Sequence, residues 1–330
     1  MKPTTSLVDI SPSMAVDIAL AGRRFPVSVG RQSGFVLLPL ANTDRKLQSE
    51  DRVNWPSFAA RIGPPDPNAQ RAHVSGGVTV LPGISQLNVD ALCFELTCDD
   101  EVMEEFEAPN PTVRALSDWL TVFRSWIAPW TRIPQLEEVR RNHPFTIILH
   151  ERDGQVVPNY FDGLSETAYL GGRLVDEEMF AAAAAAASIG RGIPEDHRMI
   201  ARAQRMLGMG DFRASIIDSC SAAEISLSHW IRKEFEHRYE DPKVASQLLS
   251  RTNGIANLFK IYFAAHDSNL AFQQIQRDLA WPRNQAVHEG IPSEQAKAQI
   301  ALSIATALIN ELAPIPLPSY FLRLLETEAE

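Results

Sequence analysis

Short runs of apolar residues, many of them β-branched or aromatic, recur through the first half of the chain. Each run has strand length and is bounded by turn residues, such as the cluster "GPPDPN" at 63–68. The runs cover residues 24–29, 34–40, 76–81, 87–97, 145–150 and 167–175. The pattern predicts a mainly antiparallel β domain.

One stretch of the first half has helical spacing instead. In "NPTVRALSDWLTVFRSWIAPW", at 110–130, Asn110 is a good N-cap and Pro111 suits the first helical position. The apolar stripe consists of Val113, Leu116, Leu120, Phe123 and Ile127, widened by Trp119, Trp126 and Trp130. So wide an apolar surface predicts a helix buried on the sheet, in preference to an exposed aromatic platform for bases or sugars.

Helical periodicity dominates after residue 176. The strongest signal is the segment 211–239, where Asp211 is the expected cap of a long apolar stripe. Further helices are expected near 177–189, 194–207, 256–266 and 293–312. We expect Ser293 to cap the last of these and the prolines at 314, 316 and 318 to end it. The short connections predict an antiparallel helical bundle.

These patterns predict an α+β protein in three parts. Residues 1–175 form a β-rich sensor or binding domain, 176–193 a helical linker, and 194–330 the helical bundle. A chain of 330 residues is long enough for two such cores.

Composition limits the partners of each part. The formal net charge is −10, and residues 181–330 hold 15 Lys+Arg against 17 Asp+Glu, which leaves −8 for the first part. A polyanion such as RNA would therefore be expected to bind to the bundle, the less acidic part of the chain. Three cysteines cannot form a closed disulfide framework, which favours the cytoplasm, and we expect neither a signal peptide nor a membrane span.

The stretch "AWPRNQAVHEG", at 280–290, carries the most specific chemistry. Pro282 predicts a helix start with Arg283 at its mouth, where free N–H groups favour an anion. Asn284 and His288 are four residues apart and share a helix face. The similar spacing in "RKEFEH", at 232–237, lies in a charged helix end and indicates only a solvated face.

The helix "GDFRASIIDSCSAAEISL" at 210–227, the later "RNQAVH" and the closing helix together resemble the HEPN superfamily. An added N-terminal β domain is also similar to its Apea-like branch, which is associated with bacterial and phage-defence proteins. The resemblance implies a metal-independent endoribonuclease of toxin or defence type. It would act as a homodimer that brings two copies of the motif into one cleft and needs no cofactor.

The resemblance also implies roles for individual residues. His288 would move protons at the ribose 2′-hydroxyl and the leaving 5′-oxygen, while Arg283 would hold the scissile phosphate. Asn284 would orient the backbone or the histidine. Glu224 would have a supporting role, for which an ion pair with a neighbouring helix is the alternative. The bundle also offers cations for substrate binding, Arg277 and Lys297.

Other interpretations stay open at this point. The bundle could be a catalytically silent binding or dimerisation module, with the β domain recognising a ligand or protein, or "RNQAVH" could be a packing turn anchored by Trp281. No phosphate loop, HExxH pair or CxxC pair occurs, so we expect no metal site. A toxin needs restraint, so we expect residues 1–175 to sense a trigger.

Overall fold

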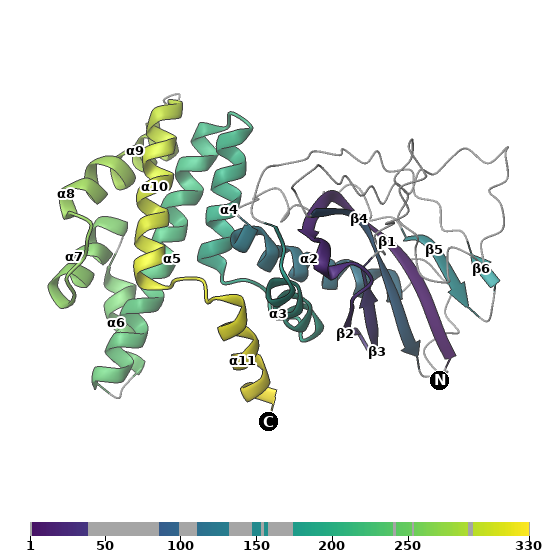
Figure 1. Ribbon diagram of the computed structural model, residues 1–330. Helices are drawn as coiled ribbons and strands as arrows, with labels where there is room; N and C mark the ends of the chain where they lie inside the picture. Colours follow the sequence, from purple (N-terminus) through teal and green to yellow (C-terminus); the bar gives the residue numbers. More distant parts are fainter. Residues whose placement is uncertain are drawn as a thin grey trace. The chain divides into compact units, whose positions relative to one another are not determined.

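The computed structural model describes residues 2–38, 86–98, 111–131, 147–152, 155–157, 174–239, 242–252, 254–289 and 293–329. The fold is α+β, with a sheet in the first part of the chain and helices in the rest (Figure 1). The chain divides into two compact units, one of residues 1–192 with 317–330 and one of residues 193–316.

The first unit contains an antiparallel sheet with the strand order β2-β3-β4-β1-β5-β6 within the described residues. The strands are β1 (Lys2–Asp17), β2 (Arg24–Val29), β3 (Gln32–Leu37), β4 (Gln86–Cys98), β5 (Ile147–Arg152) and β6 (Gln155–Val157). A short 3-10 turn, η1 (Ile18–Leu20), follows β1. The long strands β1 and β4 pair along most of their length, with an irregularity between Asp9 and Met14.

Three helices complete the first unit: α2 (Pro111–Thr131), α3 (Glu177–Ser188) and α11 (Pro318–Ala329). Aromatic rings join them to the sheet. The ring of Phe180 on α3 lies 4.5 Å from that of Phe25 on β2, and Trp126 on α2 stacks on Phe321 of α11 at 4.0 Å. Trp119, Trp126 and Trp130 are buried, which confirms the expected buried helix and excludes an aromatic platform there.

The second unit is a helical bundle built around the long helix α5 (Phe212–Tyr239). The other helices are α4 (Glu195–Gly208), α6 (Pro242–Arg251), α7 (Ile255–Ala265), α8 (Phe272–Ile275), α9 (Trp281–Asn284) and α10 (Gln295–Leu312). Two π-helical segments, η4 (Gln276–Ala280) and η5 (Gln285–Glu289), flank α9. The core takes apolar side chains from each long helix, including Ile216, Leu227, Phe259 and Leu308.

This division differs from the expected one at two places. Helix α3, expected as a linker, packs in the first unit against α2 and β2, since most of its alanines and Phe180 are buried. Helix α11, expected to belong to the bundle, returns to the first unit through Phe321. The prolines at 314–318 do end α10, but Pro318 then begins a new helix, a position where its missing N–H costs nothing.

Several local predictions can be compared directly with the structure. Asp211 caps α5, accepting a hydrogen bond from the Ala214 N–H at 3.0 Å. The predicted cap Ser293 is wrong by one residue, because Glu294 occupies the N-cap of α10 and makes no side-chain cap bond. The predicted strand at 76–81, most of that at 167–175, and Asn110 lie outside the described residues.

Candidate functional site

The "RNQAVH" stretch lies in one continuous helical run that contains α8, η4, α9 and η5. The residues at each junction, Ala280, Trp281 and Gln285, keep right-handed helical backbone angles. The predicted helix start at Pro282 is therefore wrong, and Arg283 does not stand at a free helix N-terminus. Pro282 is buried inside the run, where the preceding π turn makes room for a ring that would clash in a regular α-helix.

The second π segment changes which residues share a face. In an α-helix the hydrogen bond closes after four residues, so side chains five apart point in different directions. In a π-helix it closes after five, so residues four and five apart lie on one side. Segment η5 thereby turns His288 toward the side of both Arg283 and Asn284.

The three side chains differ in exposure. Asn284 and His288 are exposed, whereas Arg283 is half-buried against the bundle. The Arg283 Nη1 donates a hydrogen bond to Asn284 Oδ1 at 3.4 Å, and within the described residues Arg283 forms no salt bridge. Its positive charge is therefore available for an anion at the exposed end of the motif.

Helix α5 supplies a second guanidinium that sequence reasoning missed. The Arg213 Nε donates to the carbonyl oxygen of Ala286 at 2.8 Å, within segment η5. Carbonyls in the last turn of a helix lack intrahelical partners, so this bond fixes the end of the motif helix to the bundle. Arg213 lies inside the quoted "GDFRASII", but only the tertiary contact shows its role.

Glu224 takes a structural position. Its Oε1 accepts a hydrogen bond from the Ile255 N–H at 3.1 Å, at the first turn of α7. The N-cap of α7 is Gly254, which has no side chain to cap the helix, so Glu224 supplies the missing acceptor from α5. Glu224 therefore caps a neighbouring helix and does not form the alternative ion pair with it within the described residues.

The charges of Glu224 and Arg283 both act on the buried thiol of Cys220. Burial and, to a smaller extent, the Glu224 charge raise the pKa of its thiol to about 12, although the Arg283 charge acts to lower it. The thiol is therefore protonated at neutral pH and serves as a core residue. Since both charges act on this thiol, Arg283 and Glu224 approach it from two helices.

The two cations expected to bind substrate each hold a neighbouring carboxylate. The Arg277 guanidinium donates to both oxygens of Asp278, at 2.7 and 2.6 Å, and Lys297 Nζ contacts Glu294 Oε1 at 3.2 Å. Neither forms a hydrogen bond to Arg283, Asn284 or His288 in the part of the chain that the structure describes. Exposed pairs of this kind are weak, so both cations can exchange their carboxylate for a phosphate.

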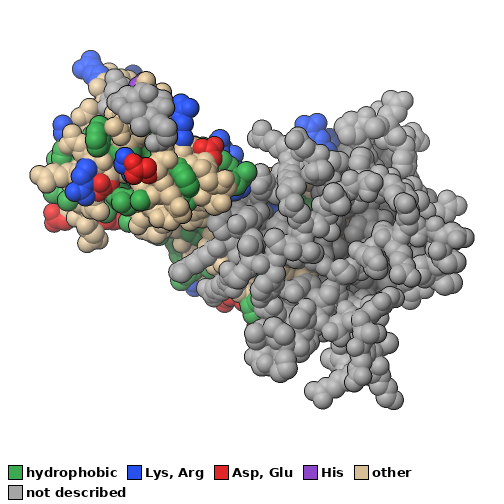
Figure 2. Space-filling model, turned by 90° about the horizontal axis from the view of Figure 1, so that it is seen from above, with side chains coloured by type: hydrophobic (Ala, Val, Ile, Leu, Met, Phe, Trp, Pro, Cys, Tyr) green, Lys and Arg blue, Asp and Glu red, His purple; other side chains and the backbone are tan. Residues whose placement is uncertain are grey.

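Charges of both signs are mixed over the visible face of the second unit (Figure 2). This mixing agrees with the balance of 15 basic and 17 acidic residues in 181–330. That face has no broad basic field that would attract a polyanion.

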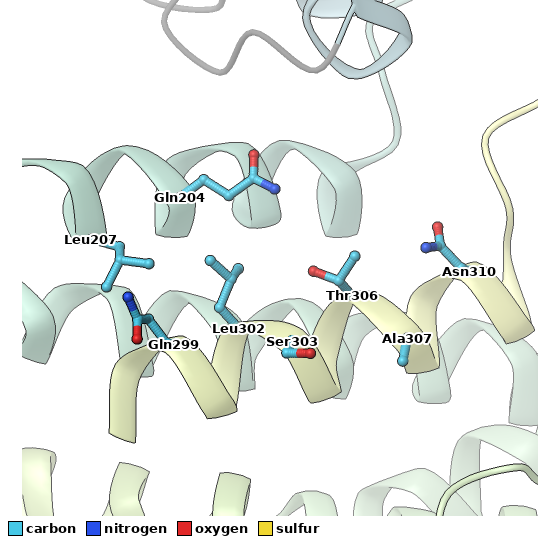
Figure 3. A pocket seen from close by; sticks show the side chains of 8 residues that line it. All are labelled: Gln204, Leu207, Gln299, Leu302, Ser303, Thr306, Ala307 and Asn310. Carbon is cyan, nitrogen blue, oxygen red and sulfur yellow. The ribbon is translucent and has the colours of Figure 1, made fainter. Parts of the chain in front are cut away.

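A groove of about 440 Å³ lies elsewhere on the bundle, between α4 and α10 (Figure 3). Its lining has no charged side chain and mixes polar with apolar groups: Gln204, Leu207, Gln299, Leu302, Ser303, Thr306, Ala307 and Asn310. None of the motif residues lines this groove, so it is separate from the candidate site.

Two other features are absent from the residues that the structure describes. No three His, Cys, Asp or Glu side chains gather where they could hold a metal ion. Likewise, no helix in these ranges has the length and apolar character needed to cross a bilayer. No family model, curated protein or solved structure matches the chain.

Proposed function

We propose that the protein is a metal-independent endoribonuclease of the HEPN type, of toxin or phage-defence function, active as a homodimer. The observation that carries the proposal is that Arg283 and Asn284, at the end of α9, share one side of the helical run with His288 on the π-helical segment η5, which Arg213 fixes to the bundle. An imidazole and a guanidinium on one side of a helix can supply a proton carrier and a phosphate ligand to the same substrate.

The chemistry follows from these two groups. A neutral His288 takes the proton of the ribose 2′-hydroxyl, which then attacks the adjacent phosphorus. Arg283 holds the phosphate and stabilises the charge that develops on its oxygens. A protonated His288 from the second copy gives its proton to the departing 5′-oxygen. Asn284, hydrogen-bonded to Arg283, keeps the guanidinium in place.

A dimer supplies both protonation states from one motif, because a two-fold axis brings two copies of His288 into one cleft. Its activity is conditional on a trigger sensed by residues 1–175. The requirement for a 2′-hydroxyl makes the enzyme specific for RNA over DNA.

A catalytically silent binding module is the second candidate. The observation in its favour is that Arg277 and Lys297 both hold carboxylates, which leaves little basic surface near the motif. In that case the uncharged groove between α4 and α10 and the β domain would carry the binding functions.

Cleavage of labelled single-stranded RNA in the presence of EDTA tests the two candidates. We expect cleavage by the wild-type chain and loss of at least about a hundredfold in rate for His288→Ala and Arg283→Ala. His237→Ala is the matched control, since Arg232 and His237 have the same spacing on an exposed helix end and should be dispensable. Equal cleavage by His288→Ala and wild type would refute the proposal.

A further inference from the structure

Trp281 is unusual among the tryptophans that the structure describes. Its side chain is 56% exposed, whereas Trp119, Trp126 and Trp130 are buried and Trp230 packs edge-on against Tyr262 at 4.7 Å. Within the described ranges Trp281 makes no ring contact and its indole N–H has no partner. The indole therefore forms no hydrogen bond or ring contact within the described part of the fold.

The neighbours of Trp281 explain how the indole is held outward. Leu279 and Pro282 on either side, and Ala286 one turn later, are buried and fix this helix to the bundle. Trp281 itself has regular helical angles, φ −66° and ψ −48°. The indole therefore projects from a rigid helix and needs no rearrangement before it binds a ligand.

The position of Trp281 relates it to the motif. Four of the exposed residues in this run lie along one stripe at helical spacing: Arg277, Trp281, Asn284 and His288. An aromatic ring thus lies one turn from the amide and two turns from the imidazole. Arg283 itself lies off this stripe, but its guanidinium reaches it through the hydrogen bond to Asn284. A phosphate bound there lies about one helical turn from the indole, within reach of an adjacent base.

We propose that Trp281 is a stacking platform for an unpaired nucleobase next to the phosphate held by Arg283. The proposal rests on the proposed function and specifies its substrate as single-stranded RNA, since a base in a duplex has no free face. Stacking on an aromatic side chain is insensitive to base identity, so the platform gives strand selectivity with little sequence preference.

A protein partner fits this surface less well. Protein contacts are built around larger apolar areas, whereas Trp281 is surrounded along its stripe by a guanidinium, an amide and an imidazole. These groups are suited to phosphates and to the polar edges of bases.

The test uses the full chain and a short single-stranded RNA with 2′-O-methyl groups throughout, which cannot be cleaved by 2′-hydroxyl attack. We expect quenching of tryptophan fluorescence on binding, lost in Trp281→Phe because the emitting ring is gone. By anisotropy of the labelled RNA, Trp281→Leu should bind about tenfold more weakly and Trp281→Phe should lose less. An oligomer with abasic sugars should bind all three proteins alike.

Phe263→Leu is the matched control, because Phe263 on α7 is 52% exposed and lies outside the stripe. Its RNA affinity should equal that of the wild type. Two results would overturn the platform: equal RNA binding by Trp281→Leu and wild type, or a changed oligomeric state in Trp281→Leu with unchanged RNA affinity, which would make the indole a protein contact.

The assay separates failure of the platform from failure of the ribonuclease. Binding of the methylated RNA does not depend on His288 chemistry, so a Trp281-dependent affinity without cleavage would contradict only the enzyme. Cleavage of ordinary RNA at the wild-type rate and affinity by Trp281→Leu would contradict only the platform.

Discussion

At the residue scale, two charged side chains on α5 form hydrogen bonds to other helices of the bundle. Arg213 binds the carbonyl oxygen of Ala286 and so holds the end of the motif helix. Glu224 instead caps α7, and its charge raises the pKa of the buried Cys220 thiol. The sequence could suggest that these residues are polar positions on the long helix, but the partner of each lies far along the chain and appears only after folding.

The role of Glu224 as a cap leads to a stability prediction. Glu224→Ala removes the acceptor of the Ile255 N–H and should lower the free energy of unfolding by about 1 kcal/mol. Glu224→Gln keeps an acceptor oxygen and should lose less. Urea unfolding followed by circular dichroism measures both. A loss of RNA cleavage in Glu224→Gln at unchanged stability would instead assign Glu224 to the reaction.

At the element scale, strong periodicity and clear caps made elements predictable. Helices α2 and α5 and the strands β2, β3 and β4 agree with the sequence pattern, because each has a continuous apolar face and a turn or cap at its ends. The sequence pattern does not predict strand β1, because Ser, Thr and two prolines hide its alternation of polar and apolar residues. Segments η4 and η5 could not be predicted, because a π turn leaves the apolar pattern almost unchanged.

The π turn before Pro282 gives a prediction that separates activity from stability. Pro282→Ala restores a backbone N–H and removes the ring that a regular helix cannot hold, so the run should shift toward α-helical bonding. The melting temperature should stay equal or rise. RNA cleavage should fall about tenfold or more, because the His288 side chain would point in a different direction around the helix axis. Melting curves and initial rates measure the two effects.

Unchanged cleavage with a raised melting temperature would show that the π geometry is not needed for the reaction. A matched control is Ala280→Ser, which changes a partly buried neighbour in the same run without changing its backbone bonding. We expect that variant to cleave RNA at the wild-type rate.

At the scale of the whole molecule, the chain enters the bundle after the first unit and returns to that unit at its end. At the bundle's own boundary, a His197 ring nitrogen is 2.7 Å from the carbonyl oxygen of Ala313, which holds the beginning of α4 to the end of α10. The return was not predictable, because an amphipathic final helix does not reveal which of two cores it joins.

The return of α11 predicts that its loss affects the first unit. Phe321 is buried and stacks on Trp126, so Phe321→Ala should destabilise that unit by about 3 kcal/mol. The second unit should unfold as before. In a chain that also carries Trp230→Phe and Trp281→Phe, tryptophan fluorescence reports the first unit, while helical circular dichroism is dominated by the second. A parallel loss in both signals would show that the two units unfold together.

The chemical nature of the new RNA ends tests the central claim most directly. Single-stranded RNA is incubated with the full chain and EDTA, and the products are identified by mass spectrometry. Attack by the 2′-hydroxyl predicts a 2′,3′-cyclic phosphate on one product and a 5′-hydroxyl on the other, with neither formed by His288→Ala. Products with a 3′-hydroxyl and a 5′-phosphate, or RNA that remains intact, would contradict the account.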